Sequence, residues 1–132
     1  MLMTSKAPNT HLSIDRTLCG EPETLSPGAA TVRFVPTPAM VADAQGLVHG
    51  GFVFGAVDYA AMLAVNDPNV VLGSADVRFV APVKLGDEVR AVAELQEEKG
   101  KKRVLSVRAS VGDREVLTGT MVAFVLDQHV LS

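Results

Sequence analysis

The sequence places a single carboxylate, Asp58, inside the apolar stretch of residues 50–65. An ionised carboxylate without a partner in such surroundings costs several kcal/mol, so this side chain needs hydrogen-bond partners, a raised pKa or access to water. Desolvation also makes a carboxylate a stronger base or nucleophile, which indicates a catalytic role. The alternative is that Asp58 faces a solvent-lined gap or caps a neighbouring backbone group.

A second candidate is the motif Val48-His49-Gly50-Gly51, which comes directly before the predicted helix. Glycines at a helix start leave backbone N–H groups open to close approach, at the positive end of the helix dipole. Such groups are suited to hold the oxyanion that develops when a carbonyl is attacked. The motif alone is weak evidence, because glycine pairs before helices are common and His49 could be an ordinary buried histidine.

The spacing between these two features limits how they can act together. Asp58 lies eight residues after Gly50, which corresponds to about 12 Å along an α-helix. This is too far for both groups to act on one carbonyl within one chain. If two helices pack antiparallel about a two-fold axis, Asp58 of one protomer can approach Gly50 of the other. The spacing therefore predicts a shared site that occurs twice per dimer.

The element that must carry Asp58 is predicted as a helix over residues 52–65, which are rich in Ala, Met and Leu and end before Asn66-Asp67-Pro68. The segment is apolar nearly all round, and a helix of this kind must be surrounded by protein. A curved sheet covers only part of one helix, so a second copy of the chain is the simplest cover for the rest. We therefore expect at least a homodimer.

Alternating apolar and polar residues predict an antiparallel sheet around this helix. Short connections between the last three strands predict a meander, and the last strand is apolar on both faces, which predicts a central position. The predicted strands cover residues 30–35, 70–80, 89–96, 105–111 and 116–126. The expected fold class is α+β, with one long central helix wrapped by a curved antiparallel sheet of about five or six strands.

Length and composition limit the class of protein. The chain has 132 residues, of which 48 % are hydrophobic and 20 % charged, and this is ordinary for one globular domain. We expect a flexible N-terminus over residues 1–10 and a single domain over residues 11–132. With 12 Lys and Arg against 15 Asp and Glu, the net charge is −3, so charge alone would bring the domain neither to nucleic acid nor to an anionic membrane.

Several kinds of site and location are disfavoured. The one cysteine, Cys19, allows neither an internal disulfide nor a multi-thiolate zinc site and fits a reducing cytoplasm. The first residues do not resemble a secretory signal, so we expect a cytoplasmic protein. A serine-hydrolase nucleophile elbow is absent. The remaining histidines, His11 and His129, lie near the ends of the sequence, without the neighbours of a hydratase or a metal site.

Together these residues resemble the hot-dog fold acyl-CoA thioesterases of the phenylacetic-acid-pathway type. The resemblance covers about residues 25–126 and rests on GLVHGG at 46–51, with Asp58 nine residues after the histidine and Ala60-Ala61 close behind. It also includes SPGAATV at 26–32 and FVAPVKLGD at 79–87. The family fold that this implies agrees with the helix and strands expected from the residue pattern.

The resemblance implies hydrolysis of a thioester to a carboxylic acid and free coenzyme A, without a metal or redox cofactor. Asp58 would be the nucleophile or the general base for water. The N–H of Gly50 would polarise the thioester carbonyl, with Gly51 beside it, and His49 would orient the site. The family also implies a homo-oligomer, either a dimer or a dimer of dimers, in which helices pack against each other and the sheets join.

The chain departs from the family pattern at two positions. The family often has an asparagine six residues before the histidine to orient the attacking water, where this chain has Asp43, with Gln45 nearby. An aspartate accepts hydrogen bonds from water but cannot donate as an amide does. Some relatives use a hydroxyl one turn after the carboxylate, where this chain has Met62. Ser74 on the following strand is the remaining candidate hydroxyl.

Coenzyme A also needs positive charge for its phosphates. The candidate groups are Lys84 in the turn after the second predicted strand and Lys99, Lys101, Lys102 and Arg103 at a predicted hairpin tip. A charged hairpin tip is more often simply solvated. A non-catalytic interpretation also stays open, because a hot-dog domain can bind acyl-CoA as a sensor or store without hydrolysing it.

Overall fold

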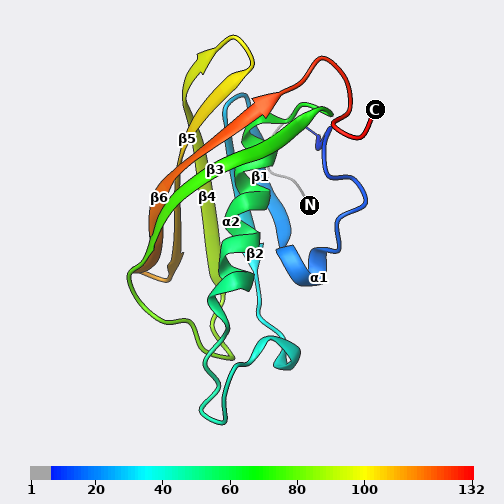
Figure 1. Ribbon diagram of the computed structural model, residues 1–132. Coiled ribbons are helices and arrows are strands. Elements are labelled where there is room, and N and C mark those ends of the chain that lie inside the picture. The colour runs from blue at the N-terminus through cyan, green and yellow to red at the C-terminus, as the bar shows by residue number, and fades with distance from the viewer. Residues whose placement is uncertain (1–6) are drawn as a thin grey trace.

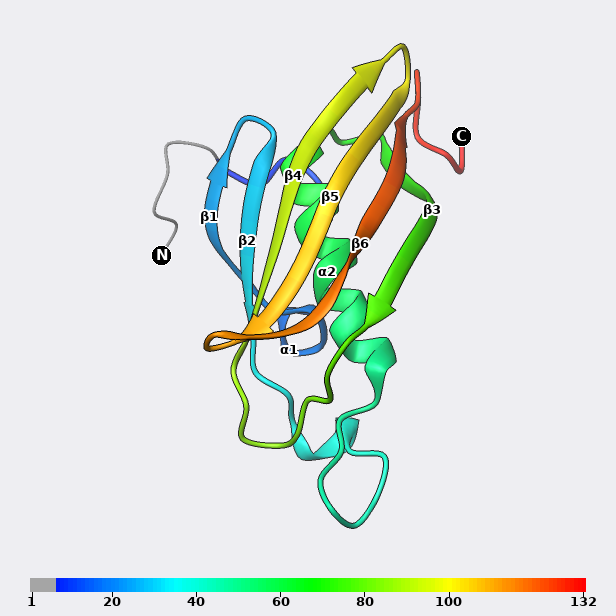
Figure 2. The ribbon, with the colours of Figure 1, turned by 90° about the vertical axis from the view of Figure 1, so that its left-hand side faces the viewer.

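The computed structural model describes residues 7–132, in which a six-stranded antiparallel sheet curves around helix α2 (Gly50–Val65) (Figure 1). The strands follow the order β1-β2-β4-β5-β6-β3 across the sheet (Figure 2). Two short elements, α1 (Arg16–Cys19) and the 3₁₀ turn η1 (Pro38–Met40), lie outside it. The strand bounds are Glu21–Ser26 (β1), Ala29–Phe34 (β2), Val70–Phe79 (β3), Val89–Lys99 (β4), Lys102–Val111 (β5) and Arg114–Val125 (β6).

This arrangement is the predicted α+β hot-dog fold. The last three strands form the expected meander, and β6 lies inside the sheet between β5 and β3. The helix begins at Gly50 rather than at residue 52, so both glycines of the His-Gly-Gly motif belong to its first turn. No helix among residues 7–132 is long and apolar enough to cross a membrane.

Strand β1 is the element that the alternation pattern misses. Its sequence, EPETLS, is polar and contains Pro22, which cannot donate a hydrogen bond to a ladder. The strand forms at the edge of the sheet, where it pairs with β2 alone. Leu25 is fully buried there. A proline is tolerated at an edge because half of the strand's backbone groups face away from any neighbour.

Helix α2 is buried on the side that faces the sheet and partly open on the other. It packs mainly over β2 and β4, and its small side chains Ala60 and Ala61 are fully buried. A stripe at helical spacing, Gly51, Gly55 and Asp58, is not fully buried, and a Cβ at Gly55 would meet nothing within 4 Å. One sheet thus leaves part of this apolar helix without cover, as the sequence predicts.

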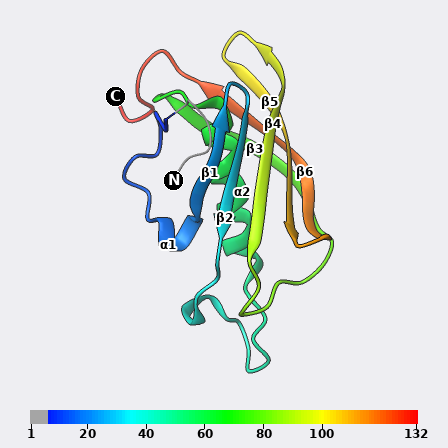
Figure 3. The same ribbon diagram turned by 180° about the vertical axis from the view of Figure 1, so that it is seen from behind.

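The first described residues and α1 lie beside α2, on the side away from β4, β5 and β6 (Figures 1 and 3). Of the segment for which flexibility is expected, residues 1–6 lie outside the described part of the chain. Residues 7–10 lie against the C-terminal end of α2, where Ala7 and Asn9 both bond to Asn66. Their backbone therefore has defined partners in the fold.

Strand β3 forms the other edge of the sheet and, among the described residues, pairs only with β6. Residues 73–76 are all exposed, as are Phe79 and Val80 further along. The two strands approach very closely at Gly119, where a Cβ would come to 2.2 Å from the backbone oxygen of Asp76. A long edge with free backbone groups and exposed apolar side chains is suited to pair with another strand.

Candidate active site

Asp58 lies midway along α2, on the part of the helix that the sheet leaves open. Its Oδ1 is the one buried side-chain oxygen or nitrogen among residues 7–132 that has no hydrogen-bond partner. Burial raises the pKa of Asp58 from 3.8 to about 6, because loss of water disfavours the charged form. Within the described chain this carboxylate caps no backbone group, so it is available to a water molecule or a proton.

The pocket around Asp58 is lined by two histidines, His11 and His129, that no local sequence pattern connects with it. This pocket of about 340 Å³ is lined by Thr10 and His11 from the start of the chain and by His129 from its end. The remaining wall is mostly apolar and includes Met62. These histidines are far from Asp58 in the sequence, and no local pattern could have brought them together. Only the return of both chain ends to α2 does so.

At the start of α2, His49 is exposed and is not the buried histidine of the alternative interpretation. Its backbone N–H donates to the carbonyl of Met40 (3.0 Å), and its own carbonyl accepts from the N–H of Phe52 (3.1 Å). Its ring packs edge-on against Phe52, with 6.1 Å between ring centroids. The ring also lies beside Gly51, where a Cβ would come to 3.0 Å from His49 Nε2.

Gly50 opens onto a second, apolar pocket. The pocket has a volume of about 200 Å³, and its walls include Val53, Phe79 and Val116. The N–H groups of Gly50 and Gly51 lie in the first turn of α2, where no preceding carbonyl is in position to accept from them. Donors of this kind at the positive end of a helix can hold a negatively charged oxygen.

The two pockets share no lining residue. Gly50 and Asp58 therefore do not face a common cavity within one protomer, in agreement with the separation of about 12 Å expected from eight residues of helix. A carboxylate that can act as a base lies in one pocket, and an N–H donor that can hold a negatively charged oxygen lies at the other.

The three residues expected to orient water lie elsewhere. Asp43 Oδ1 accepts from the N–H groups of Gln45 (3.0 Å) and Leu47 (3.2 Å), so this oxygen shapes the loop that leads to His49. Gln45 lines a pocket beside Lys84. Ser74 is exposed on β3 and lines neither the Asp58 pocket nor the Gly50 pocket. None of the three lies beside Asp58 within the protomer.

The candidate phosphate-binding cations lie on two segments, the β3–β4 connection and the β4–β5 hairpin tip, at opposite ends of the molecule (Figure 2). Lys84 lies at the end that holds the start of α2, in a pocket with Arg114 that shares Leu47, Pro82 and Val83 with the Gly50 pocket. The other four lie at the β4–β5 hairpin tip, near the end of α2. Within one protomer, the Gly50 pocket therefore adjoins Lys84, whereas this tip lies near the other end of α2.

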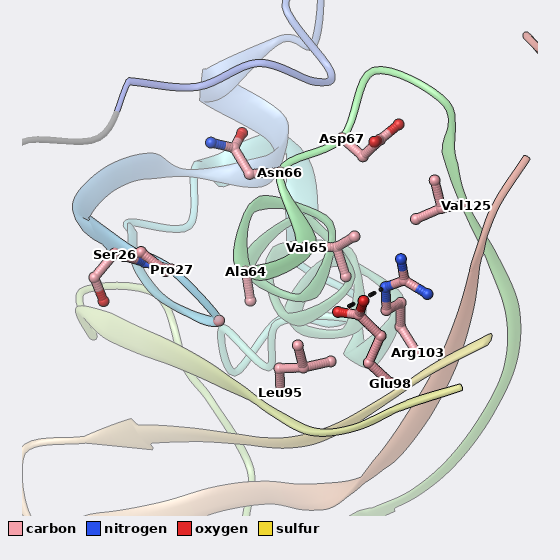
Figure 4. A pocket seen from close by; sticks show the side chains of 11 residues that line it. Ser26, Pro27, Ala64, Val65, Asn66, Asp67, Leu95, Glu98, Arg103 and Val125 are labelled. Carbon is pink, nitrogen blue, oxygen red and sulfur yellow. Dashed lines mark ion pairs between the residues drawn. The ribbon is translucent and has the colours of Figure 1, made fainter. Parts of the chain in front are cut away.

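The hairpin cations are partly neutralised by neighbours. Arg103 borders a pocket of about 410 Å³ at the C-terminal end of α2, where it pairs with Glu98 at 3.4 Å (Figure 4). It also donates to the carbonyl of Gly100 at 2.7 Å. Lys101 pairs with Asp127 at 3.0 Å. Lys99 and Lys102 are exposed. The structure thus ties Arg103 into its own hairpin instead of presenting it to a ligand.

Residues 7–132 contain no group of three His, Cys, Asp or Glu side chains that could hold a metal ion. The Asp58 carboxylate lies in one pocket with Thr10, His11 and His129, and the helix-start N–H of Gly50 lies at the other pocket.

Comparisons with known proteins give a family match and similar solved structures. Residues 56–129, more than half of the chain, match the family described as fluoroacetyl-CoA-specific thioesterase. This range includes Asp58 but begins after the His-Gly-Gly motif. The solved structure of the uncharacterized protein PH1136 from Pyrococcus horikoshii is 45 % identical, covers 98 % of this chain and 100 % of its own, and superposes with a TM-score of 0.96.

Two curated relatives extend well beyond this chain. The methylthioribose-1-phosphate isomerase of Aquifex aeolicus is 47 % identical over 119 residues, which is 89 % of this chain but only 26 % of that protein. The transcription factor FapR of Thermoanaerobacter sp. is 30 % identical over 98 residues, 74 % of this chain and 49 % of its own. The chain thus spans a quarter to a half of these relatives. Solved structures at 21 % and 22 % identity, with TM-scores of 0.73 and 0.74, share the fold.

Proposed function

Since the chain belongs to the family of fluoroacetyl-CoA-specific thioesterases, we propose that it hydrolyses an acyl-CoA thioester to a carboxylic acid and free coenzyme A. The observation that carries the proposal is the Asp58 carboxylate, buried in an apolar helix with one oxygen left without a partner. Because this oxygen has no hydrogen-bond partner, an apolar residue in place of Asp58 would lose no hydrogen bond there. The carboxylate therefore indicates a role other than stability. More specifically, we propose that the enzyme is of the phenylacetic-acid-pathway type.

In the proposed reaction Asp58 acts on a water molecule. With a pKa of about 6 the carboxylate is ionised at neutral pH and still basic enough to take a proton. The water oxygen bonds to the thioester carbonyl carbon while one of its protons passes to Asp58. The resulting oxyanion is held by the N–H groups of Gly50 and Gly51, worth roughly 3–4 kcal/mol. The C–S bond then breaks, and the departing thiolate takes the proton from Asp58.

The two halves of the site come together in a homodimer or a dimer of dimers. Gly51 and Gly55 lie on the open stripe of α2 with Asp58, and small residues let a second helix approach closely. The exposed edge of β3 is free to pair with its counterpart across a two-fold axis. Antiparallel helices then bring Asp58 of one subunit towards Gly50 of its partner, as their spacing along α2 requires.

Coenzyme A enters this arrangement from the end where α2 begins. Lys84 lies at one end of a groove that continues through shared walls into the apolar Gly50 pocket. Arg114 lies beside it but pairs with Asp87 at 3.4 Å and donates to the carbonyl of Pro82. The Lys84 amine suits a phosphate, and apolar walls suit the acyl chain or the pantetheine arm. His49, beside Gly51, orients the thioester at the helix start. The hairpin lysines Lys99, Lys101 and Lys102 lie outside this groove.

The experiment is a thiol-release assay on short aliphatic, long aliphatic and aryl acyl-CoAs with the wild type and Asp58→Asn. The variant keeps the shape of the side chain but cannot act as a base, so kcat should fall by about 10²-fold or more with little change in KM. Equal turnover by the variant would refute the role of Asp58. No turnover by the wild type across the panel would refute the thioesterase proposal.

A mixing experiment tests the shared site. Gly50→Pro removes the helix-start N–H, and proline suits the first helical position after the extended backbone of His49 (φ −62°, ψ 129°). Asp58→Asn and Gly50→Pro should each be inactive alone. After subunit exchange they should recover about a quarter of the wild-type rate, because half of the dimers are mixed and one of their two sites is intact. No recovery, with exchange verified, would place each site within one chain.

The second candidate function is non-catalytic binding of acyl-CoA. The observation that favours it is the 30 % identity to the transcription factor FapR over 74 % of this chain. Isothermal titration separates the two functions. Saturable binding without release of free coenzyme A supports the binding protein, whereas turnover that is lost in Asp58→Asn supports the enzyme.

A further inference from the structure

The segment before α1 is fastened to the end of α2 by Asn66. The N–H of Asn9 donates to Asn66 Oδ1 at 2.7 Å, and Asn66 Nδ2 donates to the carbonyl of Ala7 at 3.0 Å. Asn66 itself ends the helix in the left-handed conformation (φ 56°). The position of this segment is therefore coupled to the helix that carries Asp58.

Beyond this attachment the chain turns sharply and buries Thr10. Thr10 is 4 % exposed, the one buried polar residue among residues 7–132. Its Oγ1 lies 2.8 Å from His11 Nδ1, a hydrogen-bond distance. His11 has a positive φ of 53°, which is uncommon for a residue with a side chain. The imidazole is thus held by Thr10 and by Tyr59, whose ring centroid is 6.3 Å away.

His11 and Asp58 line the same pocket without bonding to each other directly. Its volume of about 340 Å³ leaves room for several water molecules, each of which occupies about 30 Å³ in the liquid. Because Thr10 occupies Nδ1, Nε2 is the ring nitrogen of His11 that has no partner within the described chain. The pocket therefore presents two unpartnered polar atoms, Asp58 Oδ1 and His11 Nε2, on otherwise mostly apolar walls.

We propose that His11 is a positioning residue that shares the attacking water with Asp58 and so completes the site from the N-terminal segment. This inference rests on the proposed thioesterase function. The water donates one proton to Asp58 as its oxygen bonds to the carbonyl carbon. Nε2 of neutral His11 holds the same water through a second hydrogen bond. The thiolate that leaves takes the proton from Asp58, and His11 ends the cycle in its starting form.

The groups around Asp58 support neutral His11 in this role. Burial lowers the pKa of His11, so the ring is uncharged at neutral pH. His129 lines the same pocket but is exposed, and its Nδ1 already accepts from the N–H of Leu131 at 3.0 Å. On α1, burial and then the charge of Asp58 raise the pKa of the Cys19 thiol. Cys19 therefore stays protonated in the acid range, where Asp58 and His11 titrate.

The test compares His11→Asn with the matched control His129→Asn. Asparagine tolerates a positive φ, so the first variant removes the imidazole and keeps the backbone. With acyl-CoA in the thiol-release assay, His11→Asn should lower kcat by about 10²-fold with little change in KM. His129→Asn should leave both unchanged.

The pH profile separates positioning from a merely structural role. The wild type needs Asp58 ionised and His11 neutral, so its log kcat should rise with a slope approaching two at acid pH. In His11→Asn this slope should fall to one. In His11→Gly, which also tolerates the positive φ, added imidazole should restore part of the turnover. If His11 has only a structural role, the slope in His11→Asn should stay as in the wild type, and added imidazole should restore no turnover in His11→Gly.

Wild-type kcat and slope in His11→Asn, with Asp58→Asn inactive, would overturn this inference and leave the proposed function intact. Loss of kcat in His11→Asn without a change in slope, together with no imidazole rescue in His11→Gly, would overturn it as well. A wild type that releases no coenzyme A from any substrate would overturn both proposals.

Discussion

Asp58→Asn should stabilise the protein at alkaline pH even as it removes activity. In the folded state Asp58 has a pKa of about 6, against an ordinary value of 3.8. At 1.36 kcal/mol per pKa unit, this difference corresponds to about 3 kcal/mol of destabilisation once the group is ionised in both states. Asparagine removes the charge but keeps an amide without a partner, which costs about 1–3 kcal/mol. The expected net gain is therefore about 1 kcal/mol.

The sign of the pH dependence follows from proton binding. Between pH 3.8 and about 6 the folded state holds a proton on Asp58 that the unfolded state has lost. The free energy of unfolding therefore falls as pH rises through this window and stays low above it. The assay is thermal unfolding by circular dichroism at pH 4.5 and pH 8, at one protein concentration. The variant should melt higher than the wild type at pH 8, by roughly 4 °C, and should lose this advantage at pH 4.5.

Asp113→Asn is the matched control, because Asp113 is exposed in the β5–β6 turn and its charge costs nothing to solvate. It should leave the melting temperature unchanged at both pH values. The reasoning would be refuted if Asp58→Asn melted lower than the wild type by the same amount at pH 8 and pH 4.5. That result would mean that the ionised carboxylate has partners in solution that offset its burial.

Two further predictions concern packing and substrate binding. Gly119→Ala should lower the free energy of unfolding by at least about 2 kcal/mol in urea titrations. The new Cβ would lie 2.2 Å from the backbone oxygen of Asp76 and force β6 and β3 apart. An unchanged urea midpoint would show that the two strands adjust freely. Lys84→Met should raise the KM for acyl-CoA several-fold, and less so at high salt, whereas Lys101→Met should leave KM unchanged because that amine already pairs with Asp127. Equal effects of the two lysine variants would count against the assignment of the phosphates to Lys84.

The helix and five of the six strands could be predicted because their patterns are local. Side-chain alternation and an unbroken apolar run report burial on a strand or helix without reference to the rest of the chain. Strand β1 could not, since its burial comes from an edge position and a hairpin with β2, not from its own composition. The sequence pattern predicts the helix start two residues late because glycine has poor helix propensity, although the first turn tolerates it.

For the candidate site, the sequence by itself singled out Asp58 and the His-Gly-Gly motif, and it determined that they lie too far apart on one helix to share a cavity. A charge in an apolar segment is anomalous wherever that segment folds, so its importance is visible without coordinates. Only the tertiary structure decided what surrounds Asp58. Thr10, His11 and His129 reach its pocket because both chain ends return to α2. Contacts between residues so distant in sequence depend on how the whole chain packs, which no local pattern records.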